Sequence, residues 1–175
     1  QLIKIVFPFA YLSYVIIHFW FLNQYTNKRW ALFGVGLLIS ANLFTAHATA
    51  ANRDFFLLYY NCTAAILLIL WYKKNWDSLL LLASLLAGFA TFTKMEGAFY
   101  LAIHSVLLLL ILAKRKDLSN REKLSKFLYF AVPSYFLFGF YASYRTFAHI
   151  PMDAGAQIIW SWSFLGRIPV FIHKI

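Results

Sequence analysis

Few side chains in this sequence can do acid–base or ionic chemistry, and three of them lie beside two short polar stretches. Asp54 closes one polar stretch and stands at the start of an apolar run. Lys94 and Glu96 lie in a very short connection between two other apolar runs. A carboxylate can bind a metal, a cationic group or a substrate hydroxyl, and an ammonium can bind a phosphate as a point charge. These residues are the first candidates for a site.

The same three residues also suit a purely structural role. An acidic residue at the start of a helix and a basic one at its end compensate the helix dipole, which would explain Asp54, Lys94 and Glu96 without any ligand. Lys94 and Glu96 are two positions apart, so they would not face one another on a continuous helix, and we expect each to have another partner. Both interpretations stay open at this point.

The composition shows what kind of elements must position these residues. Of 175 residues, 62% are hydrophobic and 13% are charged. A soluble domain has roughly 45–50% apolar and about 25% charged residues, so a water-soluble fold is excluded and a membrane protein is expected. One cysteine, Cys62, rules out an intrachain disulfide framework and a cysteine-based zinc cluster. No phosphate-binding loop, nucleophile elbow or HExxH motif occurs, so a nucleotide site is not expected.

Long apolar runs predict an all-α fold, a polytopic transmembrane helical bundle of about six spans within residues 1–147. The expected spans are 5–22, 30–46, 55–72, 78–92, 98–113 and 127–147. The fourth is only about 22 Å long at 1.5 Å per residue, against a hydrocarbon core of roughly 30 Å. We therefore expect the turn after it to lie below the membrane surface, where charges are costly unless paired or hydrated.

Residues 148–175 form the second predicted region. We expect an extracytoplasmic segment with an interfacial helix around its two tryptophans, Trp160 and Trp162, and the start of a further span after Pro169 as the alternative.

Basic residues alternate strongly between the predicted loops, which predicts the orientation. One set of loops holds ten lysines and arginines, and the other holds only Arg53 and Lys94. The ten are Lys28, Arg29, Lys73, Lys74, Lys114, Arg115, Lys116, Arg121, Lys123 and Lys126. By the positive-inside rule, the 114–126 loop is cytoplasmic, and Asp54, Lys94 and Glu96 lie on the opposite face. Much of the net charge of +10 is thereby explained by topology, and nucleic acid is not an expected partner.

Other polar residues fall inside the predicted spans. His18 and His104 are expected to hydrogen-bond to neighbouring helices. Asn61-Cys62-Thr63 matches a glycosylation sequon, but its place within a span should make it inaccessible.

The segment Leu86-Ala-Gly-Phe-Ala-Thr-Phe-Thr-Lys-Met-Glu-Gly97 resembles the "LAGLATLTKxEG" region of polytopic C-type (GT-C) glycosyltransferases. The resemblance is to the branch of dolichyl-phosphate-mannose protein mannosyltransferases and lipid A aminoarabinose transferases, and it covers most of residues 30–145. It implies transfer of a sugar from a polyprenyl-phosphate donor to a lipid, glycan or protein acceptor on the extracytoplasmic face. The expected location is a bacterial inner membrane, with the active face periplasmic.

The resemblance also assigns expected roles to residues. Asp54 and Glu96 would be the catalytic or substrate-positioning acids. The donor phosphate and the substrate would be bound by Lys94, His47, Arg53 and Arg145. A divalent metal is used by some relatives, so the cofactor stays open. No long acidic loop precedes the first span and Gln1 is not an initiator methionine, so we expect a fragment whose main catalytic Asp lies upstream.

Two other classes compete with the enzyme. A secondary transporter or flippase would use Lys94 and Glu96 for a substrate or coupling ion, although neither the internal repeat nor the broken helices common in such proteins is evident. In a non-catalytic membrane subunit, the charged turns would only cap helices.

Overall fold

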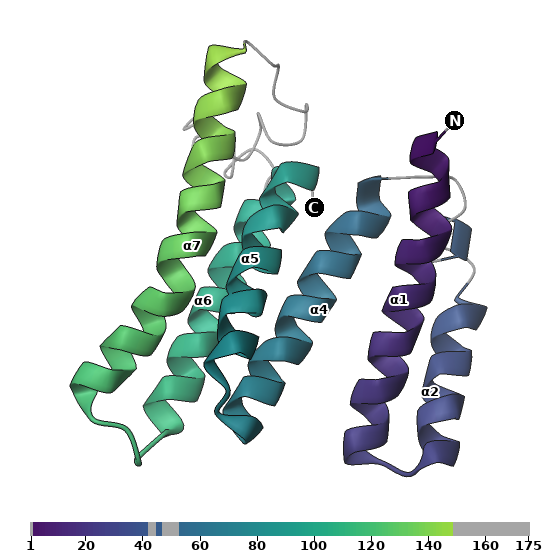
Figure 1. Ribbon diagram of the computed structural model, residues 1–175, viewed down its shortest axis with the longest axis horizontal. Coiled ribbons are helices and arrows are strands. Elements are labelled where there is room, and N and C mark those ends of the chain that lie inside the picture. The colour runs from purple at the N-terminus through teal and green to yellow at the C-terminus, as the bar shows by residue number, and fades with distance from the viewer. Residues whose placement is uncertain (1, 42–44, 47–52, 149–175) are drawn as a thin grey trace, which may run out of the picture.

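The computed structural model describes residues 2–41, 45–46 and 53–148, and the prediction of an all-α fold is confirmed. Across these residues the regular secondary structure is entirely helical (Figure 1). The six helices are α1 (Leu2–Tyr25), α2 (Lys28–Ser40), α4 (Arg53–Lys74), α5 (Asp77–Thr93), α6 (Glu96–Lys114) and α7 (Asn120–Phe147). His47 and all but the first residue of the predicted region 148–175 lie outside the described residues.

Polar residues stop and start the helices at one end of the bundle. The side chain of Asn27 accepts a hydrogen bond of 3.1 Å from Trp30 N and so begins α2. Asn75 adopts the left-handed conformation, with φ of 55°, which asparagine tolerates better than most residues and which turns the chain sharply from α4 into α5. At the start of α7, Ser119 and Glu122 form a reciprocal capping box.

Helix α5 is the centre of the larger group of helices. It packs against α4, α6 and α7, while α1 and α2 form a hairpin whose α1 lies beside α4 (Figure 1). The main core is made by residues from four helices, namely Ala64, Leu68, Trp71, Leu80, Ala83, Ala87, Leu101, Leu108, Leu112 and Phe130. A smaller cluster of Phe7, Tyr14 and Phe55 joins α1 to the start of α4. Helix α4 therefore packs into two groups, its first turn into the smaller cluster and its later turns into the main core.

Small residues allow α5 and α7 to approach closely. Ser84 Oγ donates a 2.5 Å hydrogen bond to the carbonyl oxygen of Phe130 on α7. Four residues further along α5, a Cβ added at Gly88 would come within 2.8 Å of Leu137 Cδ1 and 3.1 Å of Ser134 O. Small residues spaced four apart are typical of helix interfaces in membranes, where close backbone approach supplies the packing energy.

The expectation of about six spans is too high for the described residues. Three helices are long and apolar enough to cross a membrane, namely Val6–Tyr25 of α1, together with α4 and α6. Apolar α5 is shorter, with 17 residues, and α2 ends at Ser40 after 13 residues instead of running to 46. Helix α7 starts at Asn120, seven residues before the predicted 127, so its first turns contain charged residues. Apolar runs indicate helices, but they do not show where each helix ends.

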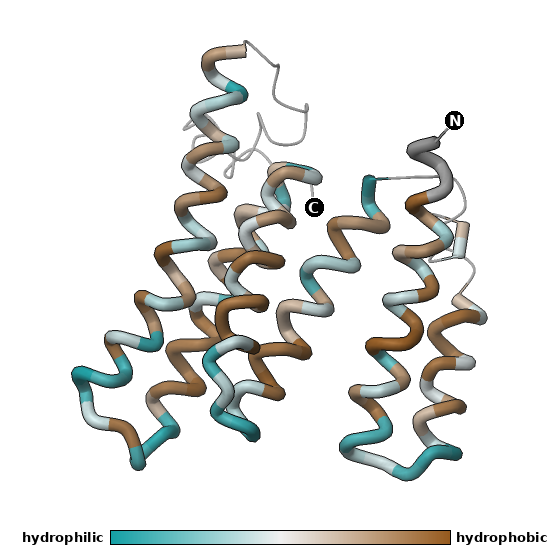
Figure 2. Tube along the Cα trace, in the orientation of Figure 1, coloured by the Kyte–Doolittle hydropathy of each residue, from teal (hydrophilic) through white to brown (hydrophobic). Residues whose placement is uncertain are grey.

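The outer surface of the bundle is apolar along the helices and charged at their ends. Large hydrophobic side chains point outward, including Phe9, Phe99 and Phe136, which are 69%, 68% and 70% exposed. Such exposure is unusual for a soluble monomer and suits a hydrocarbon solvent. The α1–α2, α4–α5 and α6–α7 connections, which carry the predicted basic set, all lie at one end (Figure 2). The α5–α6 turn and the start of α4 lie at the other.

Candidate functional site

Asp54 and Lys94 meet at the end of the bundle opposite the basic loops. Lys94 Nζ forms an ion pair with Asp54 Oδ1, joining the first turn of α4 to the turn between α5 and α6. The Lys94 side chain is 21% exposed and the Asp54 side chain 35%, so the pair is only partly solvated. The expectation that Lys94 has a partner other than Glu96 is confirmed.

The turn that carries Lys94 is shaped by a glycine. Thr93 ends α5, Lys94 is extended with φ of −157°, and α6 begins at Glu96. Gly97 lies so close to the last turn of α5 that an added Cβ would overlap the backbone of Ala90. Only a residue without a Cβ permits this tight return, and the tight return points Lys94 toward α4.

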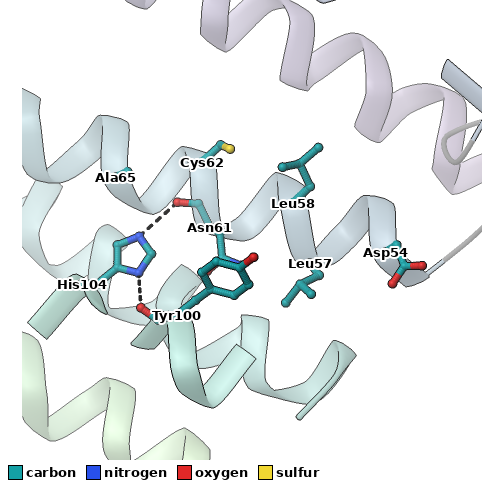
Figure 3. A pocket seen from close by; sticks show the side chains of 8 residues that line it. All are labelled: Asp54, Leu57, Leu58, Asn61, Cys62, Ala65, Tyr100 and His104. Atoms are coloured by element: carbon teal, nitrogen blue, oxygen red, sulfur yellow. Dashed lines mark hydrogen bonds between the residues drawn. The ribbon is translucent and has the colours of Figure 1, made fainter. Parts of the chain in front are cut away.

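A cavity of about 350 Å³ opens beside Asp54, between α4 and α6 (Figure 3). It is lined by Asp54, Leu57, Leu58, Asn61, Cys62, Ala65, Tyr100 and His104. Asn61 follows Asp54 by seven residues on the same helix, which places it about 10 Å deeper at 1.5 Å per residue. One end of the cavity is thus charged, and the rest of its wall is mostly apolar with a few polar groups.

His104 connects the two walls of the cavity at the level of Asn61. Its Nε2 lies 3.1 Å from the backbone oxygen of Asn61 on α4, and its Nδ1 lies 2.6 Å from the backbone oxygen of Tyr100 on its own helix (Figure 3). The prediction of a bond to a neighbouring helix is confirmed for His104. It is wrong for His18, whose Nδ1 contacts Tyr14 O one turn earlier in the same helix.

The other candidate site residues that the structure describes lie on three helices. Glu96 is exposed in the first turn of α6, where it faces the positive end of the helix dipole, and does not join Asp54 and Lys94. Arg53 is the exposed first residue of α4. Arg145 is buried near the end of α7, with its Cζ 5.7 Å from the ring centroid of Tyr141. In the described part of the chain, no three His, Cys, Asp or Glu side chains are grouped as metal ligands.

Of the described residues that line the cavity, only Asp54 was predicted as a site residue. Asn61 attracted notice only as part of a sequon, and His104 only as a helix-to-helix contact. The available signal was polarity within apolar runs, since a buried polar group in a membrane helix needs a partner or a function. Their meeting could not be read from spacing, because they are 43 positions apart.

No family model, curated protein or solved structure matches this chain.

Proposed function

We propose that this chain is part of an integral-membrane glycosyltransferase that moves a sugar from a polyprenyl-phosphate donor to a lipid, glycan or protein acceptor. The observation that carries the proposal is the ion pair of Lys94 with Asp54, a residue that lines the cavity. A carboxylate and an ammonium in contact at one end of an apolar bundle offer binding groups for a hydroxyl and for a phosphate. Both are needed where an acceptor hydroxyl displaces a lipid phosphate from a sugar.

The proposed chemistry assigns a different task to each charge. The acceptor oxygen attacks the anomeric carbon and loses its proton, while the bond from that carbon to the phosphate oxygen breaks and its electron pair leaves with the polyprenyl phosphate. Lys94 neutralises charge on the leaving phosphate. Asp54 holds Lys94 and accepts a hydrogen bond from the sugar or its acceptor, and the proton of the acceptor hydroxyl passes to a separate carboxylate base. The exposed position of Glu96 supports a lesser role for it, in orienting substrate at the entrance.

The arrangement of charges supports an orientation as well. The three basic connections share one end of the bundle (Figure 2), which under the positive-inside rule faces the cytoplasm. The ion pair then faces the extracytoplasmic side, in our proposal the periplasm. A lipid-linked sugar already carries its activating phosphate, so this side needs no nucleotide.

The direct test is sugar transfer by the full-length protein in proteoliposomes, using radiolabelled polyprenyl-phosphate hexoses. Asp54→Asn and Lys94→Ala should each lower turnover roughly 100-fold, as expected when a charge that stabilises a transition state is removed. The matched control is Asp77→Asn, because Asp77 pairs with Lys126 at the opposite end. Unchanged turnover in both site variants would remove the pair from the mechanism. Substrate uptake without sugar transfer would favour the transporter instead.

A further inference from the structure

Asn61 is a buried amide whose side-chain oxygen has no hydrogen-bond partner among the described residues. The residue is 8% exposed, and within the described part of the chain no group donates a hydrogen bond to its Oδ1. A buried amide in an apolar bundle destabilises the fold unless something completes its hydrogen bonding, and each native exception calls for an explanation. Asn61 lines the cavity beside Asp54, although its Oδ1 is covered in this conformation. A rotation of the side chain that brings the amide to a ligand in the cavity would supply the missing partner.

The protein fixes the backbone from which this side-chain amide projects. His104 contacts the backbone oxygen of Asn61 and so keeps α4 and α6 in register at this level. Rotation about the Cβ–Cγ bond exchanges Oδ1 and Nδ2, so the amide can offer either an acceptor or a donor to the cavity. Tyr100 borders the same space with an aromatic ring that ends in a hydroxyl (Figure 3).

The lining restricts the chemical class of the ligand. Among the described lining residues Asp54 carries a charge and none is a lysine or arginine, which disfavours an anionic group inside the cavity. A hydrocarbon chain would leave the amide of Asn61 unsatisfied. The volume of about 350 Å³ is near the lower limit for small-molecule sites, which excludes an extended oligosaccharide. A single neutral ring bearing hydroxyls satisfies all three restrictions.

We propose that the cavity between α4 and α6 is a hexose subsite in which the side-chain amide of Asn61 hydrogen-bonds the hydroxyls of one sugar ring. Leu57 and Ala65 contact the apolar faces of the ring, and His104 is a positioning residue that acts through Asn61. As the place of the donor sugar, this subsite rests on the proposed function, with the donor phosphate near Lys94.

Equilibrium binding to the full-length protein in nanodiscs tests the subsite without requiring turnover. The probes are polyprenyl phosphates carrying glucose, mannose or galactose, compared with sugar-free polyprenyl phosphate. The variant is Asn61→Leu, which replaces an unsatisfied amide with an apolar side chain of similar size and should not impair folding. The matched control is Thr63→Val, because Thr63 Oγ1 on α4 is also buried without a partner among the described residues, but Thr63 is not among the residues that line the cavity.

We expect wild type to bind at least one sugar-bearing lipid roughly tenfold more tightly than the sugar-free lipid, the equivalent of one or two neutral hydrogen bonds. Asn61→Leu should abolish this advantage, and Thr63→Val should keep it. Equal binding of both lipids by wild type, or an advantage retained in Asn61→Leu, would overturn the subsite and leave lipid-phosphate binding intact. If neither lipid binds, the proposed function fails, and methyl hexosides then test the subsite alone. Methyl hexoside binding lost in Asn61→Leu supports it, and its absence in wild type refutes it.

Discussion

The ion pair between Asp54 and Lys94 should stabilise the fold more than a chemically identical pair at the other end of the bundle. Two unit charges about 4 Å apart attract by about 1 kcal/mol in water and about 4 kcal/mol at the effective dielectric near a protein surface. The two side chains are 35% and 21% exposed, which places the pair between these limits. We therefore expect a coupling energy of about 2 kcal/mol.

The internal comparison is the pair of Asp77 and Lys126, whose side chains are 49% and 23% exposed and whose charged atoms lie 2.6 Å apart. Both pairs consist of an aspartate and a lysine, but the carboxylate of Asp77 has more access to water than that of Asp54. Exposed pairs of this kind contribute about 0.2–1 kcal/mol. Burial should thus separate the two pairs by at least about 1 kcal/mol.

Double-mutant cycles on the full-length protein measure both couplings. The first cycle combines Asp54→Asn with Lys94→Met, and the second combines Asp77→Asn with Lys126→Met. The free energy of reversible unfolding is measured for each variant in bicelles by steric trapping. Each cycle isolates the pairwise free energy from the single effects. A coupling for Asp54 and Lys94 that is near zero, or no larger than that of the second pair, would refute the reasoning from burial.

Three further outcomes follow from local geometry. Gly97→Ala should lower the free energy of unfolding by about 1–3 kcal/mol through overlap with α5, whereas Gly139→Ala, where an added Cβ meets nothing within 4 Å, should not; equal thermal shifts would contradict this. Gly88→Leu should force α5 and α7 apart and reduce helix protection in hydrogen exchange, and unchanged protection would show that the close contact is dispensable. Hydrogen bonds from Ser119 hold the pKa of the Glu122 carboxyl below its usual range, so the cap of α7 is complete above the unfolded pKa and is lost as pH falls through the lower folded value. Protection factors in the first turn of α7 should fall over that acidic range in wild type, but stay flat in Glu122→Gln.

The number of spans shows where apolar content misleads. Residues 30–46 read as a continuous apolar run, but α2 ends at Ser40. Composition reports solvent preference averaged over a run, while helix ends depend on individual hydrogen bonds, such as those made by the caps. The short connections, by contrast, were correctly located, because asparagine, serine and charged residues mark them directly.

The candidate site, too, could be predicted only in part from the sequence. Asp54 and Lys94 stood out because charges are rare in this chain, and the structure places them in contact. Glu96 stood out for the same reason, yet its carboxylate belongs to the exposed first turn of α6. Asn61 is uncharged, so the sequence did not mark it as a site residue. Its burial, and the lack of a partner for its Oδ1 among the described residues, are seen only in the structure.

The sequence by itself determined the helical class, the apolar surroundings and the two short stretches in which charge occurs, because these depend on composition and on local order. Only the tertiary structure decided that Asp54 faces Lys94, that His104 contacts the backbone of Asn61, and that a cavity lies between their helices. These helices are apolar on nearly all sides, so no stripe in the sequence shows which face turns toward which neighbour. That choice is made by close packing, through glycines such as Gly97 that let one backbone approach another.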